Sequence, residues 1–275
     1  MNLHVEIRGQ GYPLLCLHGH PGSGRSLSVF SDPLCQRFQT IAPDLRGYGK
    51  SRTTQPFVMA DHLQDLQALL DRLNCDRCLL LGWSLGGILA LELALQTPQR
   101  FSGLILIATA ARPYSRHPPV TNLELAFTGI AGLLNWLKPA WEWNIETFGK
   151  RSLFRYLICQ HNQSAYQYLA SEGVLAYRET SSLASKALSQ ALRQSYNRLD
   201  DLSQLTIPAL ILAGEQDYHI AASASAETAA HLPDATFHCY KNTAHLFPWE
   251  IPHQVQQDIE AWLMARPQIV ETVSR

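Results

Sequence analysis

A sharp turn that exposes a serine is the feature that most constrains the fold of this chain. Residues 82–86 read Gly-Trp-Ser-Leu-Gly and lie between an apolar run at 78–81 and an apolar segment of helical length at 88–95. The positions two before and two after Ser84 are both glycine, so the backbone can pass directly from a strand into a helix with the hydroxyl held outward. The five-letter pattern occurs by chance in many chains, but this strand–turn–helix setting predicts an exposed, nucleophilic serine.

Short apolar segments alternate with helical patterns along most of the chain. This alternation predicts the α/β class, with a mostly parallel twisted sheet of about 7–8 strands and helices on both faces. Apolar residues at three- and four-residue steps indicate helices at 63–73 and at 255–263, with Pro252 in the first turn of the latter. We expect the tail after Arg266 to be frayed. Strands are expected at residues 3–7, 14–17, 38–42, 78–81, 104–108, 209–213 and 236–240.

The alternation stops between residues 112 and 200. This stretch has no clear strand pattern, and it is rich in aromatic residues and in Leu, Ala, Ser and Gln. It holds ten Lys and Arg against six Asp and Glu, a net charge of +4, whereas the rest of the chain holds twelve against seventeen, a net of −5. We therefore predict a helical cap at 112–200, inserted into an α/β core formed by 1–111 and 201–275.

Overall charge and cysteine usage exclude several functional classes. A formal net charge of −1 gives no strong attraction for nucleic acid, and no apolar stretch reaches the roughly 18 residues of a membrane span. The chain starts without the basic and apolar regions of a signal peptide. Six cysteines, among them Cys16, Cys78 and Cys239 in apolar runs, are expected to be buried reduced thiols in a cytoplasmic protein. No zinc spacing and no dinucleotide fingerprint is present, so we expect neither metal nor cofactor.

An acid and a base for the serine follow later strands of the predicted sheet. A serine hydroxyl is a weak nucleophile until a histidine, oriented by a carboxylate, takes its proton. Asp217 comes directly after the strand expected at 209–213, with Glu215 as a rival acid, and His245 follows the last strand. Because catalytic groups of open α/β sheets gather at the carboxyl ends of the strands, these residues are expected to lie beside Ser84.

Stabilising a tetrahedral oxyanion also requires hydrogen-bond donors, which are usually backbone N–H groups. We expect one donor from Leu85, directly after the serine. The second is expected from His20, in a glycine-rich loop at 18–24 that follows an early strand. His18 is expected to brace this loop rather than to take part in chemistry.

Together these motifs resemble the α/β-hydrolase fold superfamily, in its serine esterase-like branch with a helical cap. The resemblance covers nearly the whole chain and implies Ser84 as nucleophile, Asp217 as acid and His245 as base. It also implies the N–H groups of His20 and Leu85 as the oxyanion hole. The matching segments are HGHP at 18–21, DLRGYGKS at 44–51, GWSLGG at 82–87, GEQD at 214–217 and TAH at 243–245.

The resemblance leads us to expect a serine hydrolase that cleaves a carboxylic ester or thioester through an acyl-enzyme on Ser84. The aromatic cap suggests a small-molecule substrate with an apolar acyl part, and its positive charge would suit an acidic acyl-carrier protein. The turn at 82–87 resembles carboxylesterases, including the pimeloyl-carrier methyl-ester hydrolases. Three alternatives stay open: a carbon–carbon bond hydrolase with the same triad, a proline iminopeptidase-like aminopeptidase, and a non-catalytic small-molecule receptor. The second is kept because the segment His-Pro-Gly at 20–22 is similar to a motif of proline iminopeptidases.

Overall fold

The computed structural model describes residues 1–271, and within them a single seven-stranded sheet runs through the molecule. The strand order is β1-β3-β2-β4-β5-β6-β7; β1 is antiparallel to β3 and every other neighbouring pair is parallel. All seven expected strands are present, with ends that differ by up to a few residues. They are β1 (Val5–Arg8), β2 (Tyr12–Leu17), β3 (Phe38–Pro43), β4 (Cys78–Trp83), β5 (Phe101–Ile107), β6 (Ala209–Gly214) and β7 (Ala235–Tyr240).

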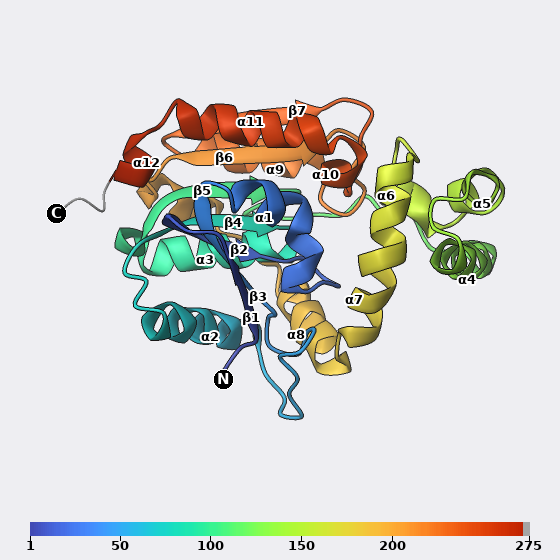
Figure 1. Ribbon diagram of the computed structural model, residues 1–275, viewed down its shortest axis with the longest axis horizontal. Helices are drawn as coiled ribbons and strands as arrows, with labels where there is room; N and C mark the ends of the chain where they lie inside the picture. Colours follow the sequence, from blue (N-terminus) through green and yellow to red (C-terminus); the bar gives the residue numbers. More distant parts are fainter. Residues whose placement is uncertain (272–275) are drawn as a thin grey trace.

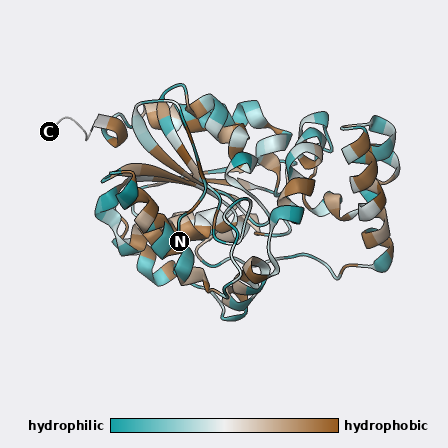
Figure 2. Cartoon of the chain, turned by 60° about the horizontal axis from the view of Figure 1, so that its bottom comes forward, coloured by the Kyte–Doolittle hydropathy of each residue, from teal (hydrophilic) through white to brown (hydrophobic). Residues whose placement is uncertain are grey.

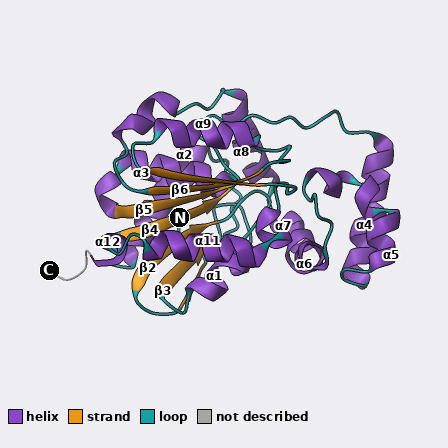
Figure 3. Cartoon of the chain, turned by 90° about the horizontal axis from the view of Figure 1, so that it is seen from above, coloured by secondary structure: helices purple, strands orange, loops and turns teal. Residues whose placement is uncertain are grey.

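Helices cover both faces of the sheet, as the alternation of patterns predicted. Figure 3 shows α1 and α11 on one face and α2, α3 and α9 on the other. The helices are α1 (Ser28–Leu34), α2 (Met59–Arg72), α3 (Leu85–Gln96), α4 (Asn122–Leu137), α5 (Glu142–Thr147), α6 (Gln163–Tyr168), α7 (Val174–Glu179), α8 (Ser182–Arg193), α9 (Ala222–His231), α10 (Phe247–Glu250), α11 (Pro252–Met264) and α12 (Gln268–Glu271).

The sheet is buried on both sides because its central strands β4, β5 and β6 are apolar at nearly every position and fully buried. Along β4, Cys78 and Leu80 pack with α2 and α3, while Leu79 and Leu81 pack with α1 and α11. Alternate side chains of a strand point to opposite faces, so one continuous apolar run supplies two separate cores. Figure 2 shows these hydrophobic strands at the centre of the molecule. This rigid centre holds the loops at the carboxyl ends of the strands.

Most of the segment between residues 112 and 200 stands beyond one end of the sheet. Figure 1 shows α4 and α5 outermost, with α6 and α7 between them and the strands. In contrast, α8 packs against α2, and its Ala184 and Ala187 belong to the core beside α2 and α3. The helical content follows the sequence pattern, while the division into a core and a cap remains a prediction.

Two expectations about the surface were wrong. The chain after Arg266 does not fray at once, because α12 follows it and Ile269 is 1% exposed, packed beside Gly103 of β5; residues 272–275 lie outside the described part. Cys239 is exposed although it lies in a strand, since β7 is an edge strand with one uncovered flank. All six cysteines are free, and Cys35 and Cys159 are only half-buried.

Candidate active site

Ser84 occupies the strained turn that its flanking glycines predicted. It joins β4 to α3 with φ 53° and ψ −116°, a backbone conformation that residues with side chains rarely adopt. A Cβ on Gly82 would lie 2.4 Å from the carbonyl oxygen of Gly86, and a Cβ on Gly86 would lie 2.0 Å from that of Leu17. Both positions therefore exclude any side chain, and the close packing holds Ser84 at the end of the sheet.

Asp217 and His245 meet at the carboxyl ends of β6 and β7. The Nδ1 atom of His245 lies 2.7 Å from Oδ2 of Asp217, and both side chains are buried. The other carboxylate oxygen accepts hydrogen bonds from the backbone N–H groups of His219 (2.8 Å) and Ile220 (3.0 Å). Because a carboxylate only accepts, Nδ1 carries the proton and Nε2 is left as the basic nitrogen. Asp217 thus orients the imidazole as a general base requires.

The histidine lies close to the serine turn. The rings of His245 and Trp83, the residue before Ser84, are 5.6 Å apart between centroids. The Ser84 side chain is half-buried, and within residues 1–271 no hydrogen bond joins its hydroxyl to His245. Catalytic hydrogen bonds in unliganded enzymes often tighten only when substrate binds. The arrangement is therefore compatible with proton transfer from Ser84 to His245 once substrate is bound.

The loop after β2 lies directly over the serine turn. A Cβ on Gly19 would lie 2.8 Å from the Trp83 ring and 3.1 Å from the Cβ of Ser84, so glycine suits this close approach. The next residue, His20, hydrogen-bonds through Nδ1 to the Tyr48 hydroxyl at 2.9 Å, and burial lowers the pKa of His20. Leu85 is the first residue of α3, where helical N–H groups have no partner within the helix. The two expected donor residues thus directly follow Gly19 and Ser84, the two residues that this approach brings together.

Two buried polar side chains brace this loop. His18 accepts a hydrogen bond at Nε2 from the Leu45 N–H (3.0 Å) and donates through Nδ1 to the carbonyl of the next residue (2.8 Å). Burial lowers the pKa of His18 to about 4, which keeps it neutral. Asp44 accepts from the N–H groups of Gly24 and Lys50, each at 2.8 Å. His18 and Asp44 therefore hold the segments at 18–24 and 44–51 in fixed positions relative to one another.

A cavity of about 480 Å³ opens beside these residues. His20, Trp83 and His245 form its inner end, and most of the remaining lining comes from α4, α7 and the segments at 153–157 and 168–173. Arg178 is the one lining residue with a formal charge among those described, and the lining is otherwise mostly apolar. The lining comprises His20, Pro21, Trp83, Thr128, Gly129, Gly132, Asn135, Leu153, Phe154, Leu157, Tyr168, Leu169, Gly173, Val174, Tyr177, Arg178, His245 and Leu246.

Sequence reasoning missed Glu250, which connects the histidine loop to the segment before α6. Its buried carboxylate accepts hydrogen bonds from the backbone N–H groups of Ala244 (2.8 Å), Cys159 (3.0 Å) and Gln160 (2.6 Å). Burial raises the pKa of Glu250. The sequence holds no signal for this role, because two of the three partners, Cys159 and Gln160, are backbone groups about ninety residues away.

Sequence reasoning also missed His219, whose ring packs edge-to-face against the ring of His245. The rings of His219 and His245 are 5.2 Å apart in an edge-to-face arrangement, and His117 stacks on the other side of His219 at 5.3 Å. Burial, and next the charge of His245, lower the pKa of His219 to about 3. A neutral ring there limits the positions that the His245 imidazole can adopt.

No cluster of three or more His, Cys, Asp or Glu residues suited to a metal ion occurs in the described part of the chain. None of the helices within residues 1–271 is both long and apolar enough to cross a bilayer.

Comparison with known protein families assigns this chain to a family. The model of the alpha/beta hydrolase fold family matches residues 12–252, which is most of the chain. The chain belongs to the α/β-hydrolase fold family. The matched region of this hydrolase includes Ser84, Asp217 and His245.

Relatives of the hydrolase carry esterase names. It is 36% identical to a pimeloyl-[acyl-carrier protein] methyl ester esterase of Vibrio campbellii, over 46% of this chain and 50% of that protein. A protein of the same name from Nitrosomonas europaea is 26% identical over 92% of this chain and 96% of its own length. The solved structure of a thermophilic esterase from Thermogutta terrifontis is similar with a TM-score of 0.68 and 26% identity, covering 96% of this chain and 93% of that one.

Proposed function

We propose that this α/β-hydrolase cleaves a carboxylic ester or thioester through an acyl-enzyme on Ser84. The observation that carries the proposal is the 2.7 Å contact between His245 Nδ1 and Asp217 Oδ2, held beside the serine turn at one end of an apolar cavity. A buried imidazole with one nitrogen tied to a carboxylate has its other nitrogen free to accept a proton, as nucleophilic catalysis by serine requires.

In the proposed reaction, Ser84 Oγ attacks the carbonyl carbon while His245 Nε2 takes its proton. The backbone N–H groups of His20 and Leu85 donate to the oxyanion of the tetrahedral intermediate. The intermediate collapses, the bond to the leaving alcohol or thiol breaks, and His245 returns its proton to that group. Water then attacks the acyl-enzyme by the same route, which releases the acid and restores Ser84. Asp217 stabilises the imidazolium in both halves.

The cavity supports a substrate with an apolar acyl part. We propose that residues 112–200 act as a cap, because this segment supplies thirteen of the eighteen residues that line the cavity beside His20 and His245. Among the described residues of the lining there is no Asp or Glu. An aminopeptidase must bind the ammonium group of its substrate, and such a charge needs a partner when desolvated. The lining therefore favours an ester over a peptide with a free amino group.

A narrower candidate substrate is an acyl methyl ester borne by an acyl-carrier protein. Two relatives carry the name of such an esterase, and residues 112–200 have a net charge of +4. A carrier-bound ester should then have a higher kcat/KM than the same acyl methyl ester free in solution. That advantage should shrink as salt screens the charges. Equal values for the two forms would reject the carrier protein as a partner.

The proposal is tested by active-site labelling alongside turnover of an ester panel. Parent protein should react with a fluorophosphonate and hydrolyse p-nitrophenyl esters, whereas Ser84→Ala should do neither and should keep its circular dichroism spectrum. Esterase activity retained in Ser84→Ala would reject the nucleophile. Labelling without turnover of any ester would favour a receptor. Turnover of ring-cleavage diketones in preference to esters would favour the carbon–carbon hydrolase.

A further inference from the structure

Two glycines lie in the middle of α4, where glycine is unfavourable. Gly129 and Gly132 are both well inside the helix Asn122–Leu137. A glycine within a helix destabilises it by roughly 0.5–1 kcal/mol relative to alanine, because it loses more backbone freedom on folding. Two such residues within four positions need a compensating reason.

Close packing is not that reason. A Cβ built on Gly129 meets no atom within 4 Å, and a Cβ on Gly132 meets only the ring of Phe154, at 3.9 Å. Other glycines of this chain are different: a Cβ on Gly149, for example, would lie 2.1 Å from the Tyr166 hydroxyl oxygen. Neither helix glycine has a positive φ, so the backbone does not require glycine there either.

The space that the two glycines leave open belongs to the active-site cavity. Residues three apart lie on the same face of a helix, and Gly129 and Gly132 both line the cavity that His20 and His245 line at its inner end. Thr128 and Asn135 continue the same wall. Side chains at the two glycine positions would project into the cavity or its mouth and reduce its volume.

We propose that Gly129 and Gly132 are specificity-determining residues that keep this wall free of side chains for the acyl part of the substrate. The inference rests on the proposed ester hydrolysis and adds a substrate class to it: esters whose acyl chain is long enough to extend along α4. The volume of about 480 Å³ lies within the usual range of small-molecule sites, roughly 300–1,000 Å³, and the apolar lining suits an alkyl chain.

A different role for glycine is to loosen α4 so that the wall can move. The two roles differ in what they predict. Extra volume in the cavity penalises long acyl chains and spares short ones, whereas a stiffer helix changes the turnover of all esters alike. A ratio of rates for two chain lengths therefore separates them.

The test compares p-nitrophenyl laurate with p-nitrophenyl acetate in three variants. Gly132→Leu should lower the laurate-to-acetate ratio of kcat/KM at least tenfold. Gly132→Ala should lower it in the same direction but less, and it covers the case in which the leucine variant does not fold. Ala126→Leu is the control: it adds nearly the same bulk at an exposed position of α4 that lies about 120° around the helix from Gly132 and does not line the cavity, and it should leave the ratio within about twofold of the parent value.

A ratio that is unchanged in both glycine variants would overturn the proposal, as would an equal fall for both esters. A similar drop in Ala126→Leu would also overturn it, because the effect would then come from α4 as a whole. These outcomes leave the proposed function standing as long as Ser84→Ala abolishes ester turnover. The chain-length ratio therefore tests the role of the two glycines, and the turnover of Ser84→Ala separately tests the serine mechanism.

Discussion

The carboxylate of Glu250 accepts a hydrogen bond from the backbone N–H of Ala244, the residue directly before His245, at 2.8 Å. Its other oxygen accepts from Cys159 and Gln160, which precede α6. One buried side chain thus joins the candidate base to the segment that leads into the wall of the cavity. The Leu246 N–H adds a further link across this junction by donating to the carbonyl of Leu157 at 2.8 Å.

Replacing Glu250 by glutamine should weaken this junction. Glutamine has one acceptor oxygen, so it cannot serve Ala244 on one side and both Cys159 and Gln160 on the other. A buried N–H left without a partner costs about 1–3 kcal/mol, and we expect the free energy of unfolding in urea to fall by about that amount. Ester kcat/KM should fall while fluorophosphonate labelling of Ser84 persists.

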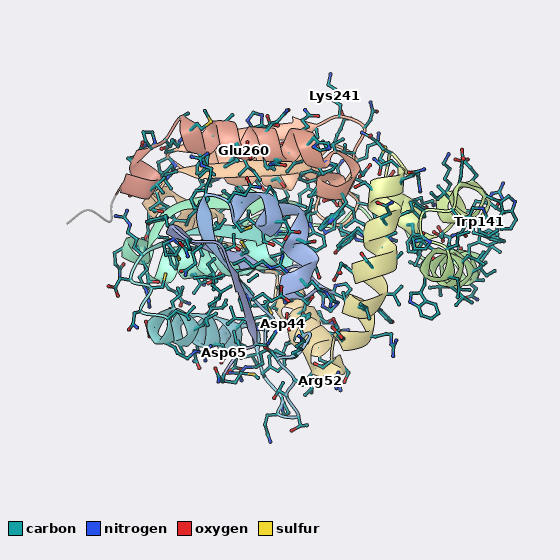
Figure 4. All side chains as sticks on the ribbon, in the orientation of Figure 1. Asp44, Arg52, Asp65, Trp141, Lys241 and Glu260 are labelled. Carbon is teal, nitrogen blue, oxygen red and sulfur yellow. The ribbon has the colours of Figure 1, made fainter. Side chains whose placement is uncertain are left out.

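The matched control is Glu260→Gln on α11 (Figure 4). The Glu260 carboxylate accepts a hydrogen bond from the Gln256 side chain on the same helix. This substitution should leave stability and activity near the parent values. Amide hydrogen exchange gives a second measurement: protection should fall at Ala244 or at Cys159 and Gln160 in Glu250→Gln. Unchanged protection at all three amides would show that Glu250 does not hold the junction.

Asp217→Asn should lower kcat by roughly 10³- to 10⁴-fold. The asparagine oxygen can still accept from the N–H groups of His219 and Ile220, so the loop should keep its shape. Its NH₂ group would donate to His245 Nδ1 and place the imidazole proton on Nε2, the nitrogen that must accept from Ser84. Steady-state kinetics with p-nitrophenyl butyrate measures the loss.

The rival acid provides the control for this experiment. Glu215 is exposed, and its Oε2 accepts only from the Asn242 N–H, at 3.2 Å, among the described hydrogen bonds. Surface substitutions usually shift free energies by no more than about 0.5 kcal/mol, which corresponds to a factor of less than about three. We therefore expect Glu215→Gln to change kcat by less than about threefold. A large loss in Glu215→Gln with a small loss in Asp217→Asn would reverse the assignment of the acid.

Stability should decrease below pH 6.5 because buried histidines resist protonation. Burial lowers the pKa of His18 to about 4 from the ordinary 6.5, and that of His62 likewise to about 4. Between these values the unfolded chain binds the proton and the folded one does not. The contribution of these neutral histidines to the free energy of unfolding is therefore complete above pH 6.5. It is lost as the pH falls to 4, by about 1.4 kcal/mol per pH unit for each such group.

Urea unfolding between pH 7 and pH 4 measures this slope. His18→Gln should reduce it by about one proton, since glutamine can still accept from the Leu45 N–H but does not titrate. An equal slope in His18→Gln and the parent would mean that His18 is not the group that resists protonation.

Glycine-to-alanine substitutions should change stability in opposite directions at different sites. Gly86→Ala brings a methyl group to about the 2.0 Å contact with the Leu17 carbonyl and should lower the free energy of unfolding by about 3 kcal/mol. Gly129→Ala meets nothing within 4 Å and should raise it by about 0.5–1 kcal/mol. Thermal unfolding of the two variants checks both signs. Destabilisation by Gly129→Ala would show a packing constraint at that position.

The sequence was sufficient where local rules decide the outcome. Apolar runs placed every strand within a few residues, because central strands of a parallel sheet are apolar at nearly all positions and differ from the helical patterns between them. The glycines around Ser84 predicted its backbone conformation for the same local reason. Cys239 and the segment after Arg266 were misjudged because exposure there depends on which strand lies at the edge and on where α12 returns to the sheet.

By itself, the sequence determined the positions of the strands and the candidate residues Ser84, Asp217 and His245, each on a loop that follows a strand. Only the tertiary structure decided that Glu250 joins the histidine loop to the segment before α6 and that Gly129 and Gly132 face the cavity. Periodicity and turn chemistry act between near neighbours, so they are written in short stretches of sequence. Contacts between a side chain and backbone groups about ninety residues away, and empty space beside a helix, depend on how the elements pack.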